Sequence, residues 1–322
     1  MLTSETNRPA PARPATARPA PARPAHRSFR VSVKGVRRLS PSFVRITFTG
    51  DDLGDFGDEG LDQRIKIVLP LPESGYDTFP VDDDWYGAWR QLPDGARHPL
   101  RTYTARAIRP AEREVDVDFV SHGDTGPASA WANHANVGDD MMLIGPDGTS
   151  GWSGSGIEWK PAGAATTLLA GDETAVPAIA AILNQLPSDA QGCVFLEVPT
   201  TADALDLVKP DGVHVEWLDR EADPAAHGTK LIDAVRNWTS RYLTATHHGK
   251  AIDPATLKDV DIDHDILWEV PEGRDLSGQF YAWLAGEAQA IKTLRRFLVS
   301  EVGIDRSQVA FMGYWRVGKS EN

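Results

Sequence analysis

Cysteine is almost absent from the 322-residue sequence, which has only Cys193, in the apolar run CVFLEV. One cysteine excludes an internal disulfide and the four-cysteine iron–sulfur cluster of a ferredoxin-type domain. It also favours a reducing compartment, so we expect a cytoplasmic protein. No apolar run reaches the roughly 18 residues that a membrane-spanning helix needs, so stable membrane insertion is not expected.

Positive charge is also scarce, because 33 Lys and Arg residues stand against 46 Asp and Glu residues. The formal net charge of -13 argues against nucleic acid and anionic membranes as partners, since both surfaces are negative. It does not argue against a local basic pocket. We therefore expect small-molecule ligands and a monomer or weak homo-oligomer.

Recognisable metal-ligand patterns are missing. The histidines, including His247 and His248, stand in neither a C-x-x-C nor an H-E-x-x-H context. The acidic run DVDIDHD has no glycine at the sixth position of an EF-hand loop, whether counted from Asp259 or from Asp261. We expect a solvated acidic loop there and no resident metal. The surrounding segment, residues 244–279, carries no functional assignment.

Composition and hydrophobic patterning divide the chain into three parts. Residues 1–25 repeat Arg-Pro-Ala, which predicts a disordered basic tail without the apolar segment of a signal peptide. Residues 26–158 hold many short alternating segments, typical of an antiparallel β-barrel, with an irregular loop over 79–99. In residues 162–318 apolar strands alternate with helices, which predicts a parallel sheet covered on both faces. The expected fold class is a β-barrel plus an α/β domain.

Two segments of the predicted barrel form a candidate site. In HPLRTYTARAIRP, Arg101 and Tyr103 share one strand face, where a core strand would carry aliphatic side chains. In VSHGDTGPASAWANHA, Pro127 suits the first turn of a helix ending near Ala135, and Ser129 with the free amides of that turn favours an anion. Alone, each segment fits a surface ion pair or a short capped helix. Together they indicate a dinucleotide site.

The sequence resembles the siderophore-interacting protein family, the flavin-dependent ferric-siderophore reductases of the ferredoxin-reductase-like flavoproteins. The resemblance runs from His26 to Gly318. Besides the two segments above, the matching stretches are DQRIKIVLP, LIGPDG, LLAGDETAVPAIAAIL, YAWLAGEAQAIKTLRRFL and GYWRVG. The resemblance implies a six-stranded-type antiparallel barrel that binds FAD, followed by a domain that receives NADH or NADPH.

Carried over by position, the resemblance implies individual roles in the barrel. Arg101 would pair with the FAD phosphates. Tyr103 would lie against the isoalloxazine and Thr104 by its reactive edge, as the catalytic residues. The start of the helix and two ring side chains would surround the diphosphate: Gly126, Pro127, Ala128, Ser129, His122 and Trp131. Lys66 and Arg106 would receive the anionic iron chelate, although Lys66 could equally extend its amine into water.

The second domain departs from the usual dinucleotide pattern. Its first turn reads GDETAVP rather than G-x-G-x-x-G, and Asp172 and Glu173 would either repel a phosphate or favour the helix dipole. Thr174 is the expected N-cap, with Pro177 in the first helical turn. The nicotinamide donor would then be held loosely or by other loops. The expected contacts of the donor are Asp172, Thr174, Gly286 and Glu287, and the resemblance implies that Trp315, near the carboxyl terminus, lies at the flavin.

Alternatives remain for three of these positions. Gly286 and Glu287 fit a tight strand-to-helix turn equally well, and Trp315 could pack the domain interface instead of the flavin. Glu197 would disfavour NADPH if its carboxylate faced the ribose.

The expected activity is electron transfer from NADH or NADPH through FAD to a ferric siderophore. Hard siderophore oxygens hold Fe(II) more weakly than Fe(III), so reduction releases the iron. No general base is required, which fits the lack of a Ser-His-Asp or Cys-His set. Two alternatives stay open: a reductase that serves free flavin or a protein acceptor, and a siderophore-binding module without flavin.

Overall fold

The structure is a computed structural model that describes residues 24–82, 84–124, 126–151, 154–222, 226–246, 259–272, 275–276 and 279–319. Nearly all of the predicted tail lies outside the described residues, as do the pair His247–His248 and part of the segment 244–279. None of the described helices combines the length and the apolar composition that crossing a membrane requires.

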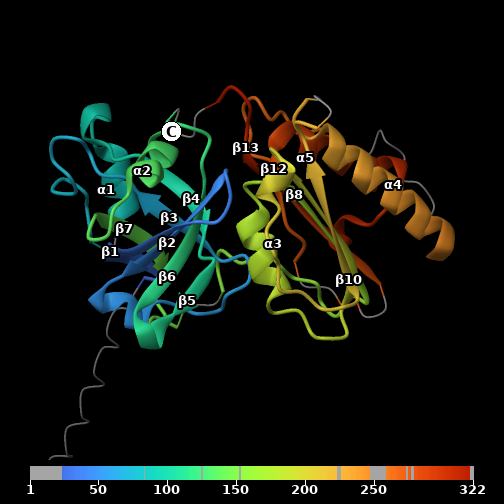
Figure 1. Ribbon diagram of the computed structural model, residues 1–322, viewed down its shortest axis with the longest axis horizontal. Coiled ribbons are helices and arrows are strands. Elements are labelled where there is room, and N and C mark those ends of the chain that lie inside the picture. The colour runs from blue at the N-terminus through green and yellow to red at the C-terminus, as the bar shows by residue number, and fades with distance from the viewer. Residues whose placement is uncertain are drawn as a thin grey trace, which may run out of the picture.

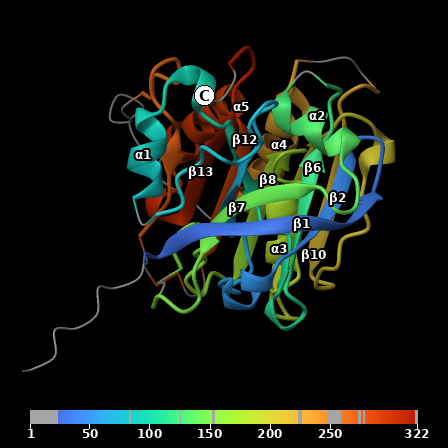
Figure 2. The ribbon, with the colours of Figure 1, turned by 90° about the vertical axis from the view of Figure 1, so that its left-hand side faces the viewer.

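The amino-terminal domain is an antiparallel sheet curled into a barrel, with β1 across its front in Figure 2. Its strands pair in the order β4-β3-β7-β1-β2-β6-β5. Their bounds are β1 (His26–Arg38), β2 (Phe43–Thr49), β3 (Arg64–Val68), β4 (Leu100–Thr104), β5 (Ala107–Arg109), β6 (Glu114–Val120) and β7 (Asp140–Pro146). The predicted strand pair around Ser-Pro is confirmed as the antiparallel hairpin of β1 and β2.

One bent strand closes the barrel. β4 pairs with β3, and two residues later the same stretch continues as β5, which pairs with β6 at the other end of the sheet. The amides at the bend bond to both partners: Ala105 N donates to Gln63 O at 2.9 Å, and Arg106 N donates to Asp116 O at 2.8 Å. With β4 and β5 taken as one strand, the barrel has the six strands that were predicted.

Alternating side chains fill the barrel because successive strand residues point to opposite faces. Val115, Val117 and Phe119 of β6 are fully buried in this core. Helix α2 (Pro127–His134) packs Ala128 and Ala132 on it. The predicted helix is confirmed, with the proline at its first residue.

The prediction of an irregular loop over 79–99 is wrong, because this segment contains helix α1 (Trp85–Gln91). The Asp84 side chain caps the helix by accepting a backbone N–H of its first turn. Trp89 is buried against the outer face of the barrel and donates from Nε1 to His98 O at 3.0 Å. Packing of one indole therefore stabilises this two-turn helix. Its sequence gives little helix signal because Gly and Asp residues surround it.

The carboxyl-terminal domain is a six-stranded sheet in the order β10-β9-β8-β12-β13-β11. The strands from β10 to β13 in that order are parallel, and β11 is antiparallel to β13. The strand bounds are β8 (Thr166–Asp172), β9 (Gln191–Val198), β10 (Val213–Asp219), β11 (Trp268–Glu269), β12 (Phe280–Glu287) and β13 (Val309–Trp315). The predicted alternation of strands and helices in a parallel sheet is confirmed.

Helices cover both faces of this sheet (Figure 1). They are α3 (Val176–Leu183), α4 (Thr229–Thr246) and α5 (Ala288–Arg295), the last continued by a π-helical stretch to Glu301. Helix α3 is buried along its whole length and lies between the sheet and the barrel, whereas α4 and α5 cover the far face. The strand order reverses direction between β8 and β12, which places the topological switch point at their carboxyl ends.

Two buried carboxylates join the domains in opposite directions. Asp62 of the barrel accepts hydrogen bonds from Trp283 Nε1 at 3.0 Å and from Trp159 N at 3.1 Å. Asp203 of the α/β domain accepts from Ser42 N, in the β1–β2 turn, at 2.7 Å. Burial raises the pKa of Asp62 to about 6, against the opposing effect of its N–H donors.

Candidate functional site

The candidate site in the barrel begins on β4. Arg101 and Tyr103 stand opposite Ile67 and Ile65 of β3, which places them on the face that lines the barrel core. The Arg101 guanidinium donates one hydrogen bond, from Nη1 to the adjacent carbonyl of Leu100 at 2.8 Å, and pairs with no carboxylate among the residues that the structure describes. Most of its donors therefore remain available to a ligand.

Aromatic rings continue the site from β4 to α2. The Tyr103 ring packs on Phe119 with centroids 4.7 Å apart, and Phe119 in turn lies 5.9 Å from Trp131 of α2. Thr104 is buried directly after the phenol. Beside Trp131 lies a pocket of about 400 Å³ that Tyr76 and Arg30 also line. Three aspartates, Asp77, Asp139 and Asp140, also line this pocket, so the barrel end combines aromatic faces with groups of both charges.

The loop before α2 folds back onto the start of the helix. The Ser129 hydroxyl accepts from His122 N at 3.2 Å and donates to Gly123 O at 2.5 Å. A Cβ on Gly126 would stand 3.6 Å from the His122 ring. These residues therefore lie together with the Ser129 hydroxyl engaged within the loop, and their roles at a diphosphate stay predictions. An anion ahead of α2 would meet the amides of Ala128 and its neighbours, which no side chain in the described part of the chain caps.

The two predicted chelate residues lie apart. Lys66 of β3 donates from Nζ to Thr102 Oγ1 of β4 at 3.1 Å. Arg106 stands four residues after Thr102, at the bend between β4 and β5, and turns toward a pocket between the domains. Their roles stay predictions, and the structure gives each a separate setting.

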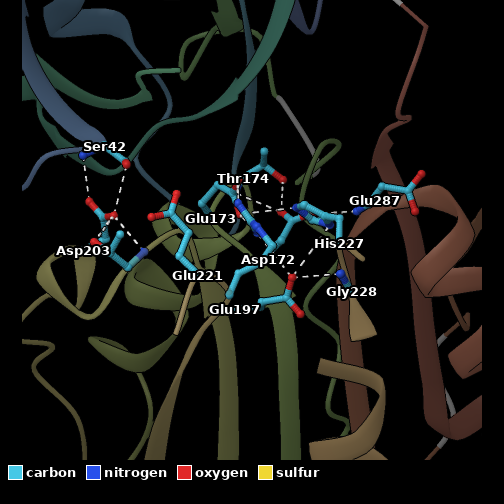
Figure 3. A network of polar contacts seen from close by, with 12 residues as sticks. Ser42, Asp172, Glu173, Thr174, Glu197, Asp203, Glu221, His227, Gly228 and Glu287 are labelled. Atoms are coloured by element: carbon cyan, nitrogen blue, oxygen red, sulfur yellow. Dashed lines mark hydrogen bonds and ion pairs between the residues drawn. The ribbon is translucent and has the colours of Figure 1, made fainter. Parts of the chain in front are cut away.

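A network of polar contacts fills the switch point of the α/β domain (Figure 3). One carboxylate oxygen of Asp172 accepts from Thr174 N and Oγ1 at 2.9 and 2.5 Å. The other accepts from Glu287 N at 2.7 Å and from Trp315 Nε1 at 2.8 Å. Burial raises the pKa of Asp172 to about 6, and the charge of Glu173 adds to this rise. Several of the predicted cofactor-binding residues meet here but hydrogen-bond to one another, namely Asp172, Thr174, Glu287 and Trp315.

Local geometry explains several of these positions. The N-cap of α3 is Ala175, so the prediction of Thr174 as N-cap is wrong; its hydroxyl binds Asp172 instead. Gly286 has a φ of 148°, and a Cβ there would stand 2.7 Å from the Asp172 carboxylate. Glu287 caps α5 by accepting from two amides of its first turn. The tight strand-to-helix turn considered as an alternative is therefore present.

Glu173 is neutralised within the protein. Arg220, directly after β10, donates to both of its oxygens at 3.0 and 2.9 Å and to Glu197 at 3.3 Å. Burial alone would raise the pKa of Glu173, but the cationic groups of His227 and Arg220 outweigh burial and lower it to about 2. The charge of Glu173 is therefore compensated mainly by Arg220 and His227. It is not a free charge that would repel a phosphate, and its main partner is not the helix dipole.

Glu197 is fully buried at the start of α4, where it accepts from Gly228 N at 2.8 Å and from Leu231 N at 3.1 Å. Its carboxylate also accepts from Arg220 at 3.3 Å. Its effect on the choice between NADH and NADPH stays a prediction.

Sequence reasoning missed His227, which joins these groups. Its Nε2 lies 3.6 Å from Glu173 Oε2, within ion-pair range but beyond hydrogen-bonding distance, and its ring stands edge-on to Trp315 with centroids 4.9 Å apart. Burial lowers the pKa of His227, but the carboxylates of Glu173 and Asp172 outweigh burial and raise it. Arg220 could have been suspected because it follows a strand at the carboxyl edge of the sheet. His227 gave no such signal.

The acidic run after α4 lies against the carboxyl-terminal segment. Arg316, the residue after β13, donates from Nη1 to Ile262 O at 2.8 Å and forms an ion pair with Asp263. Within the described ranges, no group of three or more His, Cys, Asp or Glu side chains could hold a metal ion.

A closed antiparallel barrel with a cationic and aromatic end, followed by a parallel sheet, defines the ferredoxin-reductase-like class of two-domain proteins. The chain belongs to the siderophore-interacting protein family. Residues 32–150 match the family's siderophore-interacting FAD-binding domain, and residues 164–318 match its siderophore-interacting protein model.

Relatives and solved structures agree with this membership. The chain is 31% identical over 283 residues to the ferric vibriobactin reductase ViuB of Vibrio cholerae, covering 88% of this chain and 87% of that protein. It is 26% identical to the NADPH-dependent ferric-chelate reductase of Escherichia coli, covering 88% and 91%. The crystal structure of a siderophore utilization protein from T. fusca is similar with a TM-score of 0.65 and 30% identity, covering 92% and 95%.

Proposed function

We propose that this protein is an FAD-dependent ferric-siderophore reductase that draws electrons from NADH or NADPH. The observation that carries the proposal is the end of β4, where Arg101 and Tyr103 share one face beside the start of α2. Membership of the siderophore-interacting family and similarity to two ferric-chelate reductases support it. A cytoplasmic location belongs to the same proposal, because the donor and the released Fe(II) are both used there.

The residues at the barrel end fit the tail and ring of FAD. Arg101 has donors free for a phosphate, and a guanidinium binds phosphate in a bidentate manner. The amides at the start of α2 provide a second phosphate contact. Tyr103 and Trp131 offer ring faces, and the pocket of about 400 Å³ beside Trp131 gives the adenosine end a place. Thr104 would stand at the edge of the flavin ring.

FAD bound there supplies the chemistry of accepting two electrons from a nicotinamide and passing them on one at a time. The chain's own residues position the partners. Tyr103 covers one face of the ring and excludes water from it. Lys66, on the neighbouring strand, gives an anionic chelate a positive charge in a protein that is otherwise acidic.

The decisive experiment is anaerobic reduction of the purified protein. Added NADH or NADPH should bleach an absorbance band near 450 nm, and a ferric catecholate should then restore it while a ferrous trap such as ferrozine colours. Comparing the two donors at equal concentration decides between NADH and NADPH.

Two outcomes would favour the alternatives. A colourless protein that takes up no FAD but binds the ferric chelate would be a siderophore-binding module. A protein whose bleached band is restored by free flavin and not by the chelate would be a flavin reductase.

A further inference from the structure

Four arginines of the barrel line a pocket of about 290 Å³ between the two domains. Arg37 and Arg38 come from the end of β1, Arg45 from β2, and Arg106 from the bend between β4 and β5. The opposite wall belongs to the α/β domain and is formed by α3, which includes Val176 and Ala180, and by residues 205–207. Two aspartates, Asp118 and Asp206, also line the pocket, so cations outnumber anions in a protein of net charge -13.

Arg106 is mostly buried and has little compensation from the protein. Both oxygens of Asp118 are taken by Arg45, at 2.6 and 2.7 Å, which leaves Arg106 Nε at 3.8 Å from the same carboxylate. The Arg106 side chain is 13% exposed and donates no hydrogen bond to any residue that the structure describes. Burial lowers the pKa of Arg106 and the charge of Arg45 adds to this, against the opposing charges of Asp118 and Asp116. A buried guanidinium with unused donors is a binding group for an oxyanion.

The usual place for a dinucleotide diphosphate is closed in this protein. In parallel sheets the diphosphate lies in the crevice at the switch point, over a glycine-rich turn. Here Asp172 fills that crevice, and both of its oxygens are bonded to Thr174, Glu287 and Trp315. A diphosphate must therefore lie to one side of the turn. The arginine pocket is on the barrel side, where Val176, the first residue of α3, forms part of its wall.

Position and size agree with this ligand. Arg106 follows Thr104 by two residues, a separation of at most about 7 Å along the chain, so a group bound at Arg106 is within reach of the proposed flavin edge. The volume of about 290 Å³ lies at the lower limit for small-molecule pockets. It suits a diphosphate with part of its riboses, and it is small for an iron ion wrapped in a whole siderophore.

We propose that this arginine pocket binds the diphosphate of the nicotinamide donor, with Arg106 as the main contact. The inference rests on the proposed function for the identity of the donor. It assigns donor binding to the barrel domain, in place of the missing glycine-rich turn of the α/β domain. Arg37 and Arg38, at the open side, add long-range attraction for the anion.

Calorimetric titration with ADP-ribose tests the proposal without any electron transfer, since this probe has the diphosphate but no nicotinamide. Arg106→Gln should weaken ADP-ribose binding about tenfold or more, because charged hydrogen bonds to phosphate are lost. The KM for NADH or NADPH should rise by a similar factor. Arg38→Gln, at an exposed position, should weaken binding about threefold and serves if Arg106→Gln does not fold.

Arg113→Gln is the matched control, since Arg113 is an exposed barrel arginine whose ion pair with Asp51 lies outside the pocket. Titration with a ferric dihydroxybenzoate complex distinguishes the other anionic ligand. If Arg106→Gln weakens only the ferric complex, the pocket holds the chelate and the proposal is wrong. Unchanged binding of both probes, or no binding of ADP-ribose by the wild type, also overturns it. Failure to reduce iron would instead contradict the proposed function, and would leave the ADP-ribose result valid.

Discussion

The end of the barrel and the carboxyl edge of the parallel sheet are both built from charged and aromatic side chains, but they use them differently. At the barrel end Arg101 makes one bond to a neighbouring carbonyl. At the sheet edge Arg220 is held by Glu173 and Glu197, and Asp172 has bonds to both oxygens. The first arrangement leaves binding capacity for a ligand. The second uses its capacity to hold the protein together.

The same residue type therefore carries different information in the two places. An arginine on a strand face indicates a ligand site only when its donors are left unused by the protein. An acidic turn at a switch point repels a phosphate by charge only when that charge is free; here Asp172 and Glu173 are both bonded within the protein, and Asp172 closes the crevice by occupying it. The distinction depends on partners from distant strands. Three substitutions and one change of pH test it.

Arg220→Gln should have the largest effect, a loss of about 4 kcal/mol in the free energy of unfolding. Removing the cation leaves Glu173 and Glu197 buried without their partner, which is the costly way to break a buried ion pair. Urea unfolding of the wild type, this variant and Arg241→Gln, an exposed position on α4, measures it. A loss of less than 1 kcal/mol would show that the sheet-edge network is not structural.

Arg101→Gln should instead leave the apoprotein's stability within about 0.5 kcal/mol of the wild type, because among the described residues the Arg101 side chain bonds only to the adjacent carbonyl of Leu100. FAD binding should weaken about 100-fold, equivalent to about 2.7 kcal/mol, through lost phosphate contacts. Flavin fluorescence titration measures the affinity, with Arg113→Gln as control. Full flavin occupancy in Arg101→Gln would refute the assignment of this face to FAD.

The joint between the two regions predicts a pH dependence. The pKa of Asp62 is raised from 3.8 to about 6 in the folded protein, chiefly by burial. Between these values the folded state keeps a proton that the unfolded chain has lost, so stability falls as the pH rises from about 4 to about 6. The expected loss is roughly 2 kcal/mol. Urea unfolding across this range should show a shallower slope for Asp62→Asn; parallel curves would contradict the prediction.

Trp315→Phe should have the smallest effect, a loss of about 1 kcal/mol in the free energy of unfolding. It keeps a ring beside His227 and removes only the N–H that binds Asp172 at 2.8 Å. A large drop in the rate of flavin reduction with little loss of stability would show that this indole belongs to the ligand site and not to the network.

The sequence was sufficient to predict the barrel, the parallel sheet and the start of α2, because each depends on a local pattern. Alternation marks β6, and a proline marks the first residue of α2. Helix α1 was missed because one buried tryptophan, Trp89, stabilises it through contacts with distant strands.

The sheet-edge network could not be predicted for a related reason. Asp172 is the last residue of β8, whereas Arg220 and His227 both lie in the connection from β10 to α4, and they meet because parallel strands end at one edge. The role of each of these residues depends on which charged groups and amides it contacts, and those contacts are set by the fold. Glu197 shows this most clearly, since its position at a strand end suggested a ribose contact and its partners are amides of α4.

The opposed carboxylates at the domain boundary have a consequence for motion. Moving the domains apart would break the hydrogen bonds of Asp62 with the Trp283 indole and the Trp159 amide. It would also break the hydrogen bond that Asp203 accepts from the β1–β2 turn. Because one movement would break both sets of hydrogen bonds, a hinge motion between the two domains is disfavoured. We therefore expect ligands to bind and leave without a large change in the angle between the domains. The fold, and not a closing movement, would then set the separation between electron donor and acceptor.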